Sequence, residues 1–141
     1  MKKMGVISLC VSIAAIAGCN RNKDDMQFAA TRAMLLGKWQ FVKGIDERYQ
    51  PVNVLKEHEE ETGAPGDSVI FKADNNVYDY RTLSTGVDED VYPFKLINDS
   101  TLITDDDEHW RITKLTGNEL NVYQEETEND EKTITIGYYK R

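Results

Sequence analysis

The chain has 141 residues, of which 30% are charged, and its formal net charge at pH 7 is −8. Such an acidic polypeptide repels phosphate backbones and anionic membrane surfaces, so nucleic acid is excluded as a partner. The length is enough for one domain with a modest hydrophobic core.

The N-terminus has the layout of a secretory signal. Lys2 and Lys3 precede an apolar run from Val6 to Ala17, which is shorter than the roughly 20 residues needed to span a bilayer. The segment Ile16-Ala17-Gly18-Cys19 resembles the lipobox of bacterial lipoproteins. The resemblance implies that residues 1–18 are a lipoprotein signal peptide and that Cys19 carries the lipid that holds the protein on the membrane. The alternative is an ordinary cleaved signal with an incidental cysteine.

Residues 19–25 are polar and are predicted to form a flexible tether. Within it, Lys23-Asp24-Asp25 resembles a short signal that sends some lipoproteins of one Gram-negative group to the cell surface; the alternative is a solvated linker. The expected location is the cell envelope, as an outer-membrane lipoprotein facing the periplasm or the cell surface. Cleavage before Cys19 removes Cys10, so neither a disulfide framework nor a cysteine metal site is expected.

The remaining segment, residues 26–141, is predicted to be the folded domain. Good helix formers from Met26 to Leu36 predict a short N-terminal helix. The alternation in Gly37 to Val42 predicts the first strand. The segment from Gly44 to Asp67 is dense in charge, with glycine and proline, and is interpreted as a long polar loop with one helical turn from Asn53 to Thr62.

After Asp67 the sequence alternates in short runs separated by turn residues, which is typical of antiparallel strands. Together with Gly37–Val42, eight strands are predicted, the other seven being Ser68–Ala73, Val77–Thr82, Val91–Ile97, Thr101–Thr104, His109–Leu115, Glu119–Gln124 and Lys132–Lys140. The predicted fold is all-β: a small antiparallel eight-stranded up-and-down barrel. Two packed sheets are the alternative, and pairing of the first strand with Thr133–Lys140 would decide for the barrel.

Four short motifs resemble lipocalins, and the segment 35–141 is similar to the small lipocalin-like domains of bacterial lipoproteins. The motifs are Gly37-Lys38-Trp39, Ser68–Phe71 with its following turn, Trp110–Leu115 and Tyr138–Arg141. The resemblance implies that Trp39 packs against Lys140 or Arg141 and so closes the barrel. It also implies binding of a small apolar ligand or an interaction role, not catalysis.

No cluster of residues stands out as catalytic. The acidic runs 88–90 and 105–108 lack the spacing of a calcium loop and are interpreted as solvated turns. His58 and His109 offer too few nitrogen ligands for a structural zinc site. No serine lies in a nucleophile elbow, and no glycine-rich phosphate loop is present. The chain is therefore predicted to be no enzyme and to use no cofactor or metal.

Aromatic side chains recur on the predicted strands, and they either fill the core or line a ligand cavity. The candidates are Trp39, Phe41, Phe71, Tyr78, Tyr80, Tyr92, Phe94, Trp110 and Tyr138. Tyr138 and Tyr139 point to opposite faces of one strand, so one of them is expected to be exposed.

Three functions are compatible with this pattern. The first is a lipid-anchored barrel that binds a small hydrophobic or amphipathic ligand. The second is an interaction module with a filled core, which docks an envelope protein or polymer through residues 44–67. The third is an acidic inhibitor of a basic hydrolase such as lysozyme.

Overall fold

The computed structural model describes residues 28–141, apart from the side chain of Asp106. The predicted signal peptide (1–18), the lipid-modified Cys19 and the tether (19–25) lie outside the described residues. Within residues 28–141, no helix is long and apolar enough to cross a membrane.

A short helix leads into the first strand, as predicted. Helix α2 spans Ala29–Leu35, and its last residue, Leu35, is fully buried. Leu36 has extended backbone angles, and Gly37 follows with a φ of +114°. A side chain is strained at this φ, which explains why glycine stands at the junction between helix and strand.

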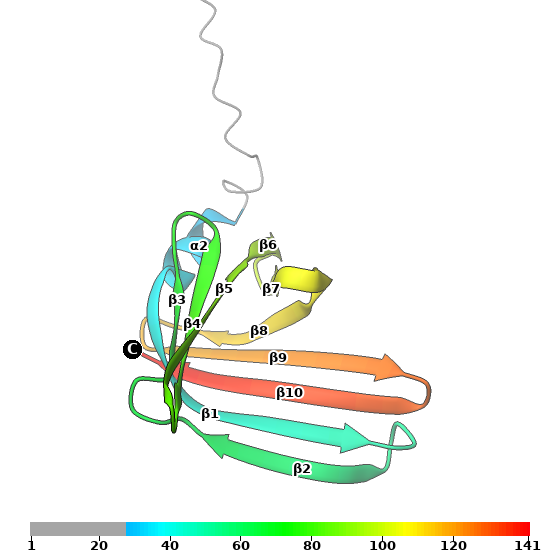
Figure 1. The fold of residues 1–141 in the computed structure, drawn as a ribbon. Coiled ribbons are helices and arrows are strands. Elements are labelled where there is room, and N and C mark those ends of the chain that lie inside the picture. The colour runs from blue at the N-terminus through cyan, green and yellow to red at the C-terminus, as the bar shows by residue number, and fades with distance from the viewer. Residues whose placement is uncertain (1–27) are drawn as a thin grey trace, which may run out of the picture.

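The rest of the described chain is almost entirely β-structure (Figure 1). The strands are β1 (Gly37–Tyr49), β2 (Leu55–Thr62), β3 (Ser68–Phe71), β4 (Asn76–Leu83), β5 (Gly86–Pro93), β6 (Lys95–Asn98), β7 (Thr101–Ile103), β8 (His109–Leu115), β9 (Glu119–Glu128) and β10 (Glu131–Lys140). A 3₁₀ turn, η1 (Asp105–Asp107), joins β7 to β8. The strands form one antiparallel sheet in the order β5-β4-β3-β1-β10-β9-β8-β7-β6, and β2 pairs with β1.

The pairing of the first and last strands confirms the predicted up-and-down antiparallel fold. Gln40 pairs with Lys140 and Phe41 with Tyr139. On its other side, β1 pairs with β3 through Gly37–Gln40. The sheet curls on itself. The strands at its two ends, β5 and β6, follow one another in the sequence. These two strands are not paired with each other in the described sheet, so the barrel is open between them.

The prediction of a loop from Gly44 to Asp67 is wrong. β1 continues to Tyr49, and the predicted helical turn is instead strand β2, which pairs antiparallel with β1. All eight residues of β2 are exposed. A strand with both faces in water shows no apolar alternation, so its sequence looks like a loop. Its glutamates meet cations across the strands, as in the Lys43–Glu60 ion pair at 3.3 Å.

The sheet has ten strands where eight were predicted, and two segments account for the difference. One is β2. The other is the predicted strand Val91–Ile97, which divides into β5 and β6 between Pro93 and Lys95. Phe94 at the division is 5% exposed, and its amide donates to the Asn75 carbonyl at 2.9 Å instead of joining a ladder. Burial of the Phe94 ring thus redirects the chain at this point.

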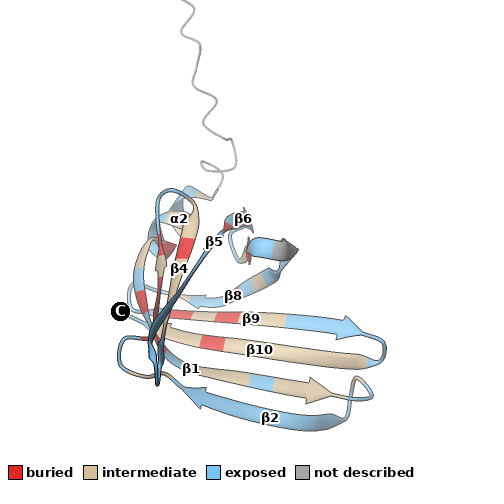
Figure 2. Cartoon of the chain, in the orientation of Figure 1, coloured by how far each residue is buried: buried red, intermediate tan, exposed pale blue. Residues whose placement is uncertain are grey.

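The core lies in the curled half of the sheet, beneath α2 (Figure 2). Its buried side chains are Leu35, Trp39, Val69, Phe71, Val77, Phe94, Leu96, Leu102, Ile112, Leu120 and Val122. Beyond this core, β2 and the far parts of β1, β9 and β10 extend as a four-stranded arm, where most residues are exposed or half-buried (Figure 2). The arm's outer strands are rich in glutamate, and charge on edge strands opposes pairing with other chains.

Candidate functional site

A cavity of about 360 Å³ lies inside the curl of the sheet. Its apolar wall comes from Val69, Phe71, Val77, Leu102, Leu120 and Val122, which belong to the four strands β3, β4, β7 and β9. Tyr92, Trp110 and Tyr139 add aromatic surface, and Val91, Thr104, Asp90, Asp105 and Glu108 complete the lining. This volume is at the lower end of small-molecule sites, and a mostly apolar wall with few polar groups is their usual composition.

The predicted aromatic residues divide into three groups. Trp39, Phe41 and Phe94 are buried in the core. Phe71, Tyr92 and Trp110 line the cavity. Phe71 also contacts Phe94 edge to face, with ring centroids 5.1 Å apart. The two readings of the aromatic pattern, core and cavity wall, therefore each apply to part of the set.

The third group lies on the outside of the sheet, so its members neither line the cavity nor belong to the buried core. Tyr78 and Tyr80 alternate with inward-facing Val77 and lie on the opposite face. Lys72 covers the Tyr78 ring at 3.5 Å from its centroid. Tyr138 is likewise on the outer face, under Lys43 at 5.2 Å. Successive residues of a strand point to opposite faces, so a one-residue error in the assignment placed these tyrosines inside instead of outside.

The barrel-closing contact involves Arg141. Its guanidinium lies 4.0 Å from the Trp39 ring centroid. Lys140, the other candidate, pairs with Gln40 along the sheet and is exposed. The Trp39 indole nitrogen donates to the Leu35 carbonyl at 2.7 Å, which fixes the ring beneath the cation.

Tyr139 on β10 also lines the cavity. Its ring lies over Gly137, where a Cβ atom would be only 2.8 Å from Tyr139 Cε2. Phe41 packs on it at a centroid distance of 5.4 Å. Burial raises the pKa of the Tyr139 phenol to about 12, although Arg81 opposes the rise. Sequence reasoning placed this residue on a face but did not assign it to the site; the glycine two positions earlier is the signal that could have found it.

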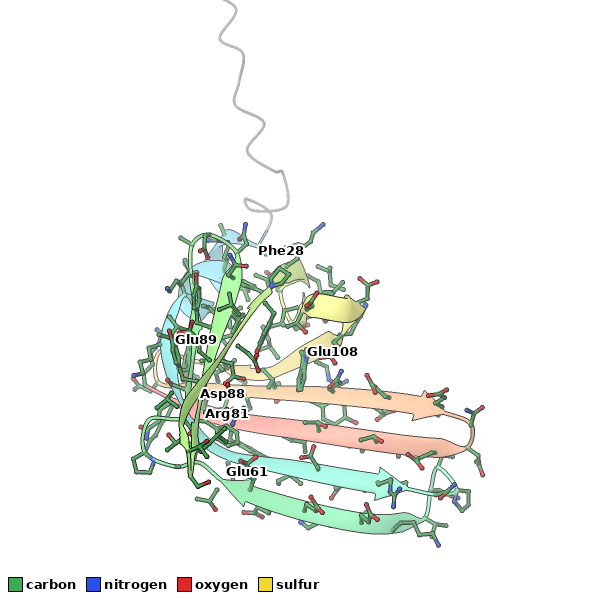
Figure 3. The ribbon with its side chains drawn as sticks, in the orientation of Figure 1. Phe28, Glu61, Arg81, Asp88, Glu89 and Glu108 are labelled. Atoms are coloured by element: carbon green, nitrogen blue, oxygen red, sulfur yellow. The ribbon has the colours of Figure 1, made fainter. Side chains whose placement is uncertain are left out.

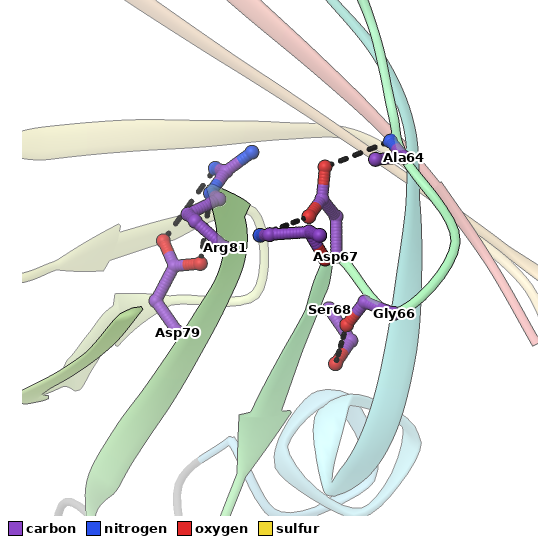
Figure 4. Close-up of polar contacts among 7 residues, drawn as sticks. Ala64, Gly66, Asp67, Ser68, Asp79 and Arg81 are labelled. Atoms are coloured by element: carbon purple, nitrogen blue, oxygen red, sulfur yellow. Dashed lines mark hydrogen bonds and ion pairs between the residues drawn. The ribbon is translucent and has the colours of Figure 1, made fainter. Parts of the chain in front are cut away.

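Sequence reasoning also missed a half-buried ion pair on the inner face of β4. Arg81 Nε donates to Asp79 Oδ1 at 3.0 Å (Figure 4), and the guanidinium lies 4.4 Å from the Phe41 ring centroid. Burial raises the pKa of the Asp79 carboxyl despite Arg81, and the neighbouring Asp90 adds to the rise. The sequence did contain a signal for this pair: Asp79 and Arg81 are two and four positions after Val77, so all three side chains point to the same face of the strand.

Asp67 holds the start of β3 against the end of β4. This carboxyl is 4% exposed and accepts hydrogen bonds from the amides of Thr82 at 2.6 Å and Ala64 at 2.8 Å (Figure 4). Burial works to raise its pKa, but these two amides and Arg81 outweigh burial, and the pKa of Asp67 lies below its usual value. Asp67 therefore stabilises the β3–β4 end of the site as a carboxylate.

Two acidic positions stand at the two sides of the barrel opening. Glu108 precedes β8, whereas Asp88 and Arg81 lie on the β4–β5 side (Figure 3). Charged groups on both sides of the opening act on the phenol of Tyr92 in β5. Burial raises the pKa of its phenol, and Asp79, Tyr139 and Glu108 raise it further. Among the described residues, no group of three or more His, Cys, Asp or Glu could hold a metal ion.

No protein-family model and no curated protein matches the chain. Three solved structures are similar to it at the level of shape. A deswapped triple mutant of bovine odorant-binding protein has 13% identity and a TM-score of 0.45, covering 77% of this chain and 74% of that one. Aphrodisin, a sex pheromone from female hamster, has 13% identity and a TM-score of 0.46, with coverages of 76% and 74%.

The third structure is bovine odorant-binding protein in complex with a selenium-containing odorant. It has 14% identity and a TM-score of 0.46, covering 78% of this chain and 71% of that one. Because these identities and TM-scores are low, the fold is assigned from the strand pairing and not from the three solved structures.

Proposed function

We propose that this protein is a lipid-anchored cell-envelope lipoprotein whose barrel binds a small hydrophobic or amphipathic ligand. The observation that carries the binding role is the cavity of about 360 Å³ with its apolar and aromatic wall. The opening between β5 and β6 gives a ligand a way in.

Binding is tested by titrating the full chain carrying Cys19→Ser with a fluorescent apolar probe such as 1-anilinonaphthalene. Trp110 lines the cavity, so its emission should be quenched with saturation at one probe per chain. A Trp39→Phe background isolates this signal. Linear, non-saturable quenching would contradict the proposal.

A matched pair of variants locates the bound probe. Val122→Phe adds bulk at the cavity wall, whereas Val87→Phe makes the same change at a position that is 69% exposed and outside the cavity. We expect Val122→Phe to weaken binding by about tenfold, because the added ring occupies space that the probe needs. Val87→Phe should bind as the parent does. Equal affinities for the two variants would place the probe elsewhere and overturn the proposal.

Native mass spectrometry of protein purified from a cell envelope extract would identify the natural ligand. A discrete extra mass that is lost on denaturation would give its class. A bare protein mass combined with failed probe titration would favour the alternative, a module that docks an envelope protein or polymer. The arm, which contains most of residues 44–67, would then be the surface to study.

The anchor is tested separately through Cys19. Acyl chains contribute about 0.8 kcal/mol per buried methylene, so several chains on one residue hold a protein on a membrane almost permanently. Cys19→Ala should release the protein from the membrane fraction after a carbonate wash. Retention of the Cys19→Ala variant on membranes would contradict the lipid anchor.

A further inference from the structure

Among the described residues, every charged side chain that lines the cavity is a carboxylate. These are Asp90, Asp105 and Glu108, and no lysine, arginine or histidine of the described chain joins them. Asp90 is in β5, and Glu108 immediately precedes β8, so they come from the two sides of the opening. Both are exposed, and neither forms an ion pair with any side chain in the described part of the chain.

The inner face of β4 and β5 places further negative charge next to this rim. Asp79 and Asp90 are direct cross-strand partners, and like charges in this arrangement destabilise a sheet. Arg81 donates a hydrogen bond to Asp79 at 3.0 Å, and its own cross-strand partner is Asp88. One guanidinium thus faces three aspartates, and the site keeps an excess of negative charge.

The aromatic wall suits the same kind of ligand as the carboxylates. Tyr92, Trp110 and Tyr139 present ring surface in the cavity, and the faces of aromatic rings attract cations, alkylammonium groups among them. Carboxylates at the rim add direct charge attraction. An anionic head would be repelled by Asp90 and Glu108, and the net charge of −8 opposes its approach.

We propose that the ligand of the cavity is an amphipathic cation: an apolar body carrying an amine or quaternary ammonium group. Its head lies between Asp90 and Glu108, beside Tyr92 and Trp110. Its apolar part contacts Leu102 and Val122 deeper in the cavity. This inference rests on the proposed binding function and adds the charge of the ligand to it.

The test compares three probes with the same decyl chain: decyltrimethylammonium, decanol and decanoate. Each displaces 1-anilinonaphthalene from the full chain carrying Cys19→Ser, below its micelle concentration and at low salt. Two rim carboxylates and the ring faces together should make the cation bind about tenfold more tightly than decanol, with decanoate the weakest. The preference should shrink as salt is added.

Paired charge variants separate the rim from the overall charge. The double variant Asp90→Asn with Glu108→Gln should reduce the preference for the cation over decanol to about twofold. The control Glu59→Gln with Glu126→Gln removes the same charge from exposed positions on the arm and should keep the full preference.

The outcomes distinguish this inference from the function on which it rests. Decanol or decanoate binding as tightly as the cation would overturn the inference and leave the binding function standing. An equal loss of preference in both double variants would also overturn it, because the rim would then have no special role. Failure of all three probes and of 1-anilinonaphthalene to bind would overturn the binding function itself.

Discussion

The guanidinium of Arg141 covers the indole of Trp39 and at the same time hydrogen-bonds the end of the N-terminal helix. Its Cζ lies 4.0 Å from the Trp39 ring centroid, and it donates to the carbonyls of Met34 at 2.9 Å and Leu36 at 2.5 Å. The last residue of the sequence therefore joins three features at one point: the helix end, the first strand and the largest buried side chain.

Replacing Arg141 with alanine should destabilise the fold by about 1–3 kcal/mol, from loss of the cation–π contact and of its hydrogen bonds. Thermal or urea unfolding measures the change. Lys140→Ala is the matched control, because Lys140 is an exposed neighbour and should change stability little. Similar losses in the two variants would contradict a specific role for Arg141.

Gly137 should not tolerate alanine. A Cβ atom there would lie 2.8 Å from Tyr139 Cε2 and 3.1 Å from a Val122 methyl, which is overpacking of the kind that costs about 1–3 kcal/mol. Gly117→Ala, where no atom lies within 4 Å of the added Cβ, should leave stability nearly unchanged. The comparison uses equilibrium unfolding, and an unaffected Gly137→Ala variant would show that Tyr139 moves aside freely.

Asp67 should give the protein stability that acid removes. Because its folded-state pKa lies below the ordinary value of 3.8, its contribution is complete above that value and is lost as the pH falls through the folded pKa. Asp67→Asn should cost about 1–3 kcal/mol at neutral pH, since an amide cannot accept both backbone hydrogen bonds as well. The variant should also lose stability less steeply in acid. Glu59→Gln on the exposed β2 strand is the control, and a parallel acid profile for parent and Asp67→Asn would refute the assignment.

Tyr139 should make stability fall in alkali. Its pKa is raised from 10.0 to about 12, so its contribution is present below pH 10.0 and is lost as the pH rises towards the folded value. Tyrosinate absorbance in the folded protein should show a late step to which Tyr139 and Tyr92 both contribute, and Tyr139→Phe should make that late step smaller. Tyr138→Phe, on the outer face of the same strand, should keep it. Loss of the late step in Tyr138→Phe instead would reverse the two assignments.

The sequence predicted the elements that have one solvent-exposed and one buried face. The helix before Gly37, the strands around the Asn75 turn and the hairpin at Gly117 all show alternating or periodic apolar residues next to turn formers. Such patterns report burial directly, because they record which side chains leave water. The arm carries no such signal: β2 is exposed on both faces, and β1 supplies its pairing partner from outside the local sequence.

The candidate site was only partly predictable for the same reason. Phe71 and Trp110 were among the candidates and do line the cavity, but Tyr78 and Tyr138 were equally plausible until strand parity was known. Asp79 and Arg81 gave no apolar signal, although they form an ion pair inside the curl of the sheet. A charged residue facing inward is stabilised by its partner, and the partner's position is a tertiary property.

The sequence by itself determined an all-β antiparallel chain with a helix at its start and a basic residue over Trp39. The helix and the strands follow from local periodicity and turn chemistry, whereas the basic residue over Trp39 was implied by the resemblance to lipocalins. Only the tertiary structure decided where the barrel opens, how far β1 and β2 extend beyond it, and which faces enclose the cavity. Those features depend on pairing between distant strands, because a shift of one residue in register exchanges the inside of a sheet for its outside.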